Sequence, residues 1–415
     1  MKKDIAIYFT GKIIPALLNL ALIILVVRFL GKDQYGKYSL LFYVIMLIHT
    51  LTFGWIQQSI LRFLSSYVFF YNITVNRFFT HIIMSSLIGT LLLAIVSFFY
   101  FHLSLLEICT IMIFLVLFNL YMFQLTLYQA RFKSLKYAVN EIIYNVSMFI
   151  ILCFFMITLV YKNYFIVFYS MIGGLILVEL LSLIFFLRKF NKIVISKKFF
   201  NKRFFNQTFS YGIRVTIWLF ISYIFNISDR FFIKEFIGYK EVGIYSSVYD
   251  IIFKIAGFTC MPVLLAYHPK IVEQWNKNNR QNSFRLIFQA LKYEIFIFIV
   301  VCLIFFPGKD ILYNTILKLN EGHLWHLTIP LIISAFLWQF AMLLHKPCEL
   351  LFRLDKMITG ILISLIVNII ANLIFIPLYG YQAAAYTTLV GVMVYIAYIV
   401  PPSGVFKNLL IKIDN

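Results

Sequence analysis

Charged residues within long apolar segments carry the clearest chemistry in this sequence. Asp229 and Arg230 are adjacent, and Asp250 precedes Lys254 by four residues, a spacing that favours an acid–base pair along one helix. A hairpin between their segments would also bring Arg230 and Asp250 to a similar depth. Because a charge inside an apolar span is costly, it usually pairs or marks the path of an ion. Two interpretations stay open: a structural or gating charge network, or a carboxylate at Asp229 or Asp250 that binds a coupling ion, Na⁺ or H⁺.

Two further basic residues lie at a similar depth in other apolar segments. Lys12 and Arg214 each come about seven residues after the expected start of a span, which is roughly 10 Å along a helix. Each could bind an anion there or extend its side chain to the membrane surface. Glu179, Lys292 and Glu294 also lie in apolar segments, but the sequence shows no partner for them and they stay unassigned.

The segments that hold these charges are predicted to be transmembrane helices. Hydrophobic residues make up 62% of the chain and charged residues 13%, which leaves too little polar surface for a soluble globule. A spanning helix needs about 20 mostly apolar residues, and the alternation of apolar runs with short polar breaks predicts about twelve of them. Pro and Gly within the runs, and the length of the runs, favour helices over barrel strands.

Basic residues are concentrated in alternate loops. Since basic loops remain in the cytoplasm, this pattern predicts that both termini are cytoplasmic. The net charge of +20 is spread over these loops, which fits a bilayer with anionic lipids and gives no reason to expect nucleic acid. The 5 cysteines lie in apolar runs without the spacing of a metal site, so neither a metal nor a disulfide framework is predicted.

One segment of the chain occurs nearly twice. FLGKDQYGKYS at residues 29–39 recurs as FIGYKEVGIYS at residues 236–246, and Asn19 upstream recurs as Asn226 at the same offset. A duplicated unit in a very apolar protein is typical of transporters, in which two bundles enclose a central site. The repeat therefore predicts two related bundles around a central cavity.

The longest polar break divides the chain near its middle. It gives an N-terminal six-helix bundle at 1–187, a basic cytoplasmic linker at 188–207 and a C-terminal six-helix bundle at 208–415. The linker is expected to anchor the protein to the inner membrane surface, as an amphipathic helix with Phe199, Phe200, Phe204 and Phe205 embedded in lipid.

Three segments resemble a known family. FLGKDQYGKYSLL, followed by Arg62 at the end of the next span, resembles the N-terminal signature of the polysaccharide-type (Wzx-like) flippases of the MOP exporter superfamily. Residues 211–252 are similar to the seventh and eighth helices of that family, and IPLYGYQAAAYTTLVG from Ile376 is similar to its penultimate turn. The resemblance spans nearly the whole chain. There is one departure, because Arg214 stands where the family often has proline.

The resemblance implies an all-α polytopic protein of the bacterial cytoplasmic (inner) membrane. Such a flippase moves undecaprenyl-diphosphate-linked oligosaccharide from the inner to the outer leaflet by alternating access, for O-antigen or capsule assembly. Sugars and phosphates cannot cross hydrocarbon unaided, so a cationic, water-filled cavity would lower the barrier. The lipid-linked oligosaccharide is the expected partner, with the polymerase and glycosyltransferases of the same pathway as further candidates. No catalytic residue and no cofactor beyond a coupling ion is expected.

The resemblance also gives the polar residues provisional roles. Arg214 and Lys12 become the candidate ligands of the diphosphate. Asn19 and Asn226 could hydrogen-bond sugar hydroxyls, or could link helices instead.

Two other functions remain as alternatives. An ion-coupled multidrug antiporter of the same superfamily would share the fold, although a cationic cavity disfavours its usually cationic cargo. A polytopic membrane polysaccharide polymerase or glycosyltransferase would need a large outer loop or an acidic sugar-nucleotide motif, and the sequence contains neither.

Overall fold

The computed structural model describes residues 2–64, 71–160, 162–186, 201–319 and 324–404, and every regular element in these ranges is a helix. Within the same ranges, 12 helices are long and apolar enough to cross a membrane. The predicted all-α polytopic fold is therefore confirmed. The contacts within the chain divide it into two compact units, made of residues 1–22 and 41–220 (unit 1) and of residues 23–40 and 221–415 (unit 2).

Helices α1, α2 and α7 contribute residues to both units. Their bounds are α1 (Lys2–Leu30), α2 (Lys32–Phe63) and α7 (Lys202–Phe236). The predicted linker at 188–207 lies mostly outside the described residues, and its last residues begin α7. The predicted bundle boundaries follow the repeat rather than the contacts, and they remain a prediction.

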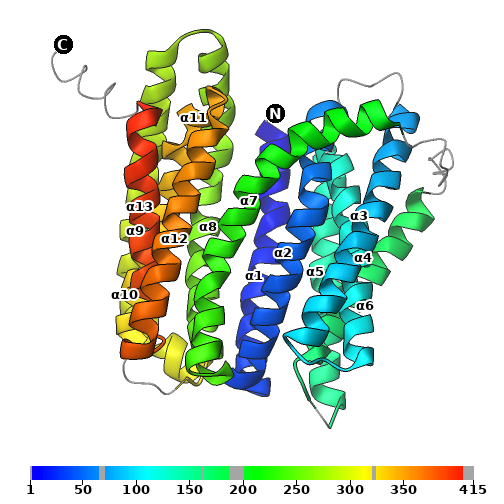
Figure 1. Ribbon diagram of the computed structural model, residues 1–415, viewed down its shortest axis with the longest axis vertical. Helices are drawn as coiled ribbons and strands as arrows, with labels where there is room; N and C mark the ends of the chain where they lie inside the picture. The colour runs from blue at the N-terminus through cyan, green and yellow to red at the C-terminus, as the bar shows by residue number, and fades with distance from the viewer. Residues whose placement is uncertain (1, 65–70, 161, 187–200, 320–323, 405–415) are drawn as a thin grey trace. The chain divides into compact units, whose positions relative to one another are not determined.

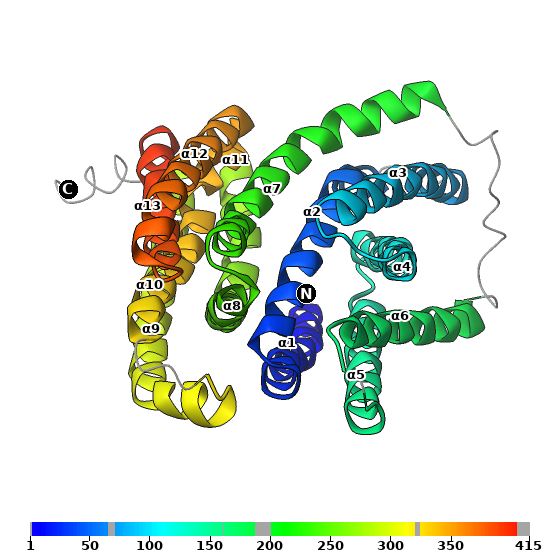
Figure 2. The ribbon, with the colours of Figure 1, turned by 60° about the horizontal axis from the view of Figure 1, so that its bottom comes forward.

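Unit 1 is completed by four helices, of which α4 lies between α3 and α6 (Figure 2). They are α3 (Tyr71–Phe99), α4 (Leu105–Ala130), α5 (Ser134–Thr158) and α6 (Phe165–Phe186). Helices α2 and α7 cross at Gly212, where an added Cβ would overlap the carbonyl oxygen of Trp55. Ser59 donates a hydrogen bond of 2.7 Å to the carbonyl oxygen of Thr208 at the same crossing. A glycine at position 212 is thus needed for α7 to approach α2.

The start of α7 packs into the protein interior of unit 1. Phe204 is buried, with its ring 5.1 Å from that of Phe78 and 5.9 Å from that of His81. Phe205 is partly buried against the same cluster. The prediction that Phe204 and Phe205 lie in lipid is therefore wrong, while Phe199 and Phe200 lie outside the described residues. The basic residues around Phe204 and Phe205 suggested a segment at the membrane surface, whereas these two phenylalanines form the apolar contact of α7 with α2 and α3.

Unit 2 contains the remaining elements, with α12 and α13 running side by side as an antiparallel pair (Figure 1). The elements are α8 (Tyr239–Asn276), α9 (Arg280–Asp310), the π-helix η3 (Ile311–Ile316), α10 (Leu324–Leu344), α11 (Lys346–Leu350), α12 (Leu354–Tyr379) and α13 (Ala383–Ser403). Helix α10 packs against α8, α9 and α13.

The two copies of the repeated segment meet within unit 2. An added Cβ at Gly36 would overlap the carbonyl oxygen of Tyr239, and one at Gly243 would overlap the carbonyl oxygen of Lys32. Gly36 is equivalent to Gly243 and Lys32 to Tyr239 at the repeat offset, so the two close contacts are equivalent. The third residue of each copy is a glycine at positive φ, Gly31 in the first copy and Gly238 in the second. The pairwise repeat that the sequence predicts is thus present in the structure.

Candidate functional site

Asp229 is enclosed by hydrogen-bond donors from three other helices. Its side chain is on α7 and only 1% of the residue is exposed. Tyr245 donates to it at 2.5 Å, Asn372 at 2.7 Å and Asn368 at 3.2 Å, and the Thr388 hydroxyl donates as well. We call these five residues the aspartate cage. All of the donors are neutral, and each donates to one of the two carboxylate oxygens.

Close helix packing builds the aspartate cage. An added Cβ at Gly391 of α13 would come within 2.5 Å of the Phe225 ring on α7, so the glycine lets the two helices approach. Ser364 of α12 donates to the Gly391 carbonyl oxygen at 2.5 Å. The two cage asparagines stand four residues apart on α12 and therefore share one face.

The aspartate cage has the composition of a monovalent cation site. Rotation of an amide presents its oxygen in place of its nitrogen. Asn368 and Asn372 could then join the hydroxyls and the Asp229 carboxylate in a shell of oxygen ligands, the kind that hard cations prefer. Sequence reasoning singled out Asp229 but missed its partners. The signal available was the spacing of two asparagines in an apolar helix and the Thr pair that opens the next one.

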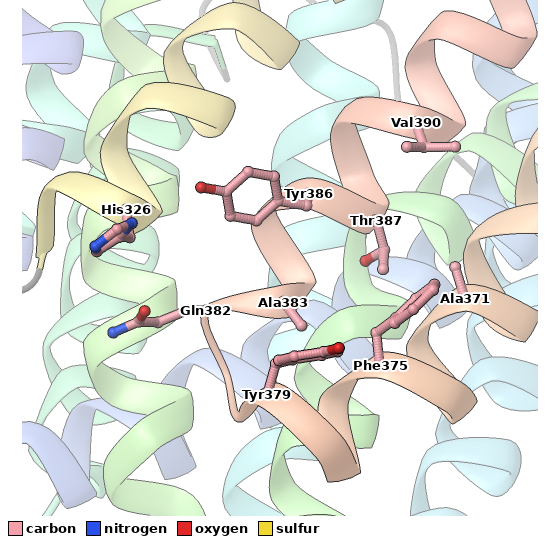
Figure 3. A pocket seen from close by; sticks show the side chains of 9 residues that line it. All are labelled: His326, Ala371, Phe375, Tyr379, Gln382, Ala383, Tyr386, Thr387 and Val390. Atoms are coloured by element: carbon pink, nitrogen blue, oxygen red, sulfur yellow. The ribbon is translucent and has the colours of Figure 1, made fainter.

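A cavity of about 440 Å³ is lined by residues of α10, α12 and α13 (Figure 3). Phe375, Tyr379 and Tyr386 give it aromatic walls, and Gln382 lies at its edge. Thr387 lines the cavity and donates a hydrogen bond to the Asn372 side-chain oxygen. Thr387 thus connects the cavity wall to the cage by a hydrogen bond.

The Arg230 guanidinium forms a second buried group next to the cage. It is fully buried and donates to Ser246 at 2.9 Å, to the Asn226 carbonyl oxygen at 2.7 Å and to Asp250 at 2.7 Å. Tyr35 donates to the other oxygen of Asp250 at 2.7 Å. The expected proximity of Arg230 and Asp250 is confirmed. The hydrogen bonds named here pair these two residues with each other and with other groups of the protein.

Lys254 does not pair with Asp250. The within-helix pair suggested by their spacing is wrong, because Arg230 and Tyr35 occupy both oxygens of that carboxylate. Lys254 is exposed, and no ion pair or hydrogen bond joins it to another described residue.

Unit 1 presents two exposed arginines on α2 and α7. Arg62 and Arg214 form no ion pair with any residue that the structure describes. The Arg62 guanidinium lies 5.0 Å from the centre of the Tyr211 ring, which is a cation–π distance. Arg62, Tyr211 and Gln58 line a cavity of about 420 Å³. Arg214 follows Tyr211 by three residues on α7, so the two residues lie on the same side of that helix. We call Gln58, Arg62, Tyr211 and Arg214 the arginine patch.

Lys12 is not part of the arginine patch. It forms an ion pair with Glu141 of α5 and donates to the Tyr137 hydroxyl at 2.9 Å, with 28% of its side chain exposed. Its charge is thus already compensated. The sequence gave no sign of Glu141 as a partner because the two residues are far apart along the chain.

The repeat-related asparagines make equivalent contacts. Asn19 donates to the Pro15 carbonyl oxygen at 2.8 Å, and Asn226 donates to the equivalent Ser222 carbonyl oxygen at 2.7 Å. Each also reaches another helix: Asn19 donates to Asn145 at 2.9 Å, while Asn226 accepts from Tyr249 at 2.7 Å. Both amides therefore link helices in this conformation.

Comparisons with known proteins agree with this architecture. The family model described as "Polysaccharide biosynthesis protein" matches residues 1–275. No curated protein matches the sequence.

Solved structures show the same fold at low sequence identity. A lipid II flippase MurJ, in an inward closed conformation, matches with a TM-score of 0.73 and 13% identity over 95% of this chain and 87% of its own. An outward-facing multidrug resistance MATE transporter of the MOP superfamily matches with a TM-score of 0.68 and 14% identity over 97% of this chain and 95% of its own. The chain has the fold of these transporters and belongs to the polysaccharide biosynthesis protein family.

Proposed function

We propose that this protein is a flippase for undecaprenyl-diphosphate-linked oligosaccharide in the bacterial cytoplasmic membrane. It would carry the cargo from the inner to the outer leaflet by alternating access, with both termini cytoplasmic, in the assembly of O-antigen or capsule. The family match and the shared fold with a lipid II flippase support this class of cargo. The observation that carries the proposal is the arginine patch, because its two cations have no anionic partner among the described residues.

The arginine patch suits a diphosphate. A planar guanidinium can donate two parallel hydrogen bonds to phosphate oxygens, and such charge-assisted bonds are about twice as strong as neutral ones. Arg214 is proposed as the main ligand and Arg62 as its neighbour. Lys12 is a secondary ligand, since binding would first require it to leave Glu141. Asn19 and Asn226 reach sugar hydroxyls only if their helix contacts open.

The aspartate cage is proposed as the coupling-ion site. Na⁺ or H⁺ that enters down its gradient would bind Asp229 and favour one conformation of unit 2. The Arg230–Asp250 pair would hold the hairpin of α7 and α8 rigid next to the cage. Lys254, exposed and unpaired within the described residues, is proposed as a gating charge. No step requires covalent chemistry.

Two assays in one set of strains test the proposal. A strain that lacks its own flippase is complemented with this protein, and surface glycan is measured together with membrane abundance. The same protein is then expressed in a strain sensitive to ethidium. Restored glycan display without ethidium resistance is the expected result. Ethidium resistance without glycan display would replace the proposal with the antiporter function.

A further inference from the structure

Glu294 is a buried carboxyl group without a partner. It lies in the middle of α9 in unit 2, and only 2% of the residue is exposed. Its Oε2 atom is buried and makes no hydrogen bond. No ion pair or hydrogen bond joins Glu294 to any of the residues that the structure describes.

The helices packed against α9 supply no charge at this depth. On α8 the titratable neighbour is the Cys260 thiol, which is almost fully buried and interacts electrostatically with Glu294. Tyr267 of α8 contacts Tyr293, the neighbour of Glu294 in the sequence, and is uncharged. Lys254 lies nearly two turns before Cys260 on α8, at 3.6 residues per turn.

Helices α10 and α9 also supply no charged partner for Glu294. On α10 the only titratable side chain in the sequence of the helix is His326, in its first turn. On α9 itself, Lys292 and Tyr293 are exposed, and the Tyr293 ring lies 6.0 Å from the Tyr267 ring of α8. The immediate surroundings include Ile287 and Ala290, both buried. Nothing described here offsets a negative charge at Glu294.

Burial without a partner decides the protonation state. An ionised carboxylate in such surroundings costs several kcal/mol even after relaxation, so the group is neutral instead. We propose that Glu294 binds an exchangeable proton, which it holds as a carboxylic acid in this conformation. The site is separate from the aspartate cage, where four donors contact the Asp229 carboxyl.

The proton can leave only when water or a base reaches Glu294. Only 2% of Glu294 is exposed in this conformation, so exchange requires α9 to move relative to the helices packed against it, α8 and α10. Proton release would then accompany a change of conformation in unit 2. The protonated state rests on burial alone. A link between the proton and cargo movement rests on the proposed flippase function as well.

Infrared spectroscopy of the purified full-length protein in liposomes tests the protonation state directly. A protonated carboxyl has a C=O stretching band that an ionised carboxylate lacks. The difference spectrum between wild type and Glu294→Gln should show this acid band in the wild type. Glu294→Met, which has a similar volume and no polar oxygen, should give the same difference and guards against misfolding of the Gln variant. Asp229→Asn serves as the matched control and should leave the acid band of Glu294 in place.

Exchange is read from the same band. After transfer to D₂O the acid band should shift as deuterium replaces the proton, and it should shift faster when a sodium gradient drives the protein. Carboxylate bands assigned to Glu294 would overturn the protonated state. An acid band that never shifts, while backbone amides exchange, would overturn the exchangeable proton.

A transport arm separates this inference from the flippase proposal. Wild type in liposomes should flip a fluorescent undecaprenyl-diphosphate glycan several-fold faster when a pH gradient is imposed, and Glu294→Gln should lose that response. Should the wild type flip no such glycan while the acid band is present, the proton site would stand and the flippase proposal would fail. If Glu294→Gln keeps the full pH response, the proton at Glu294 has no part in coupling.

Discussion

Residues 19–43 and 226–250 are copies of one hairpin, and they differ at the positions that carry charge. Asp229 and Arg230 of the second copy stand where the first has Leu22 and Ile23. These four side chains are all buried, with exposures between 0% and 3%. The fold therefore makes both pairs of positions interior, and only the sequence makes one pair ionic. Shared geometry is kept at the glycine contacts, while the chemistry lies in a single copy.

The strongest way to break this comparison is to remove one charge from the ionic copy. Asp250→Leu leaves the buried Arg230 cation without its carboxylate, which should cost about 3–5 kcal/mol of stability. We expect little folded protein in the membrane. The measurement is fluorescence-detected size-exclusion chromatography after heating.

The matched control removes both charges of the buried pair. Arg230→Met combined with Asp250→Leu removes both charges and should recover most of the lost stability, since a buried pair often contributes little net free energy. A double variant as unstable as Asp250→Leu would show that the pair does more than neutralise itself.

The aspartate cage gives the next largest effect. A cation that binds only the folded protein adds about 2.7 kcal/mol of stability at 100 times its dissociation constant. Wild type should therefore gain thermal stability as Na⁺ is raised, with a choline salt as the control for ionic strength. Asp229→Asn should lose this gain while it still folds, because its amide can keep part of the hydrogen-bond network.

The outcome of that titration also identifies the ion. A gain with Na⁺ in the wild type and none in Asp229→Asn assigns sodium to the cage. No gain in the wild type at any concentration would exclude a sodium site there.

The next prediction concerns Arg214 of unit 1, the proposed diphosphate ligand. If it binds the diphosphate, Arg214→Ala loses a hydrogen bond to a charged group, typically about 1.5–3 kcal/mol, or roughly 10- to 100-fold in export. Arg214→Lys should recover only part of the activity because it lacks the planar fork. Glycan display in the flippase-null strain, corrected for membrane abundance, measures both variants. Full export by Arg214→Ala would remove this residue from the site.

Lys12 provides the contrast within unit 1. Lys12→Gln leaves Glu141 without its cation, so we expect lower membrane abundance. Export per molecule should fall less than in Arg214→Ala.

The sequence predicts features that rest on composition and on short-range spacing. Twelve apolar spans and the turn repeat follow from patterns within single segments, and both are present in the structure. The partner of Asp250 could not be identified from spacing alone. Lys254 is four residues away on the same helix, and Arg230 is at a similar depth on the preceding helix, so the sequence allows either pair. The burial of Phe204 and the pairing of Lys12 with Glu141 depend on how separate helices pack. Such contacts leave no periodic signal in a single sequence.

The smallest expected effect concerns the contacts that the two copies share. Interhelical hydrogen bonds in membrane proteins contribute about 0.6 kcal/mol on average. Asn19→Ala and Asn226→Ala should each lower thermal stability by this order and leave export per molecule unchanged, because each amide only links helices. Thermal denaturation in detergent gives the first quantity, and glycan display divided by membrane abundance gives the second. A several-fold fall in export at unchanged stability would place that asparagine against the sugar instead, and an effect in only one copy would show that the carbohydrate contacts, like the charges, are confined to one half of the repeat.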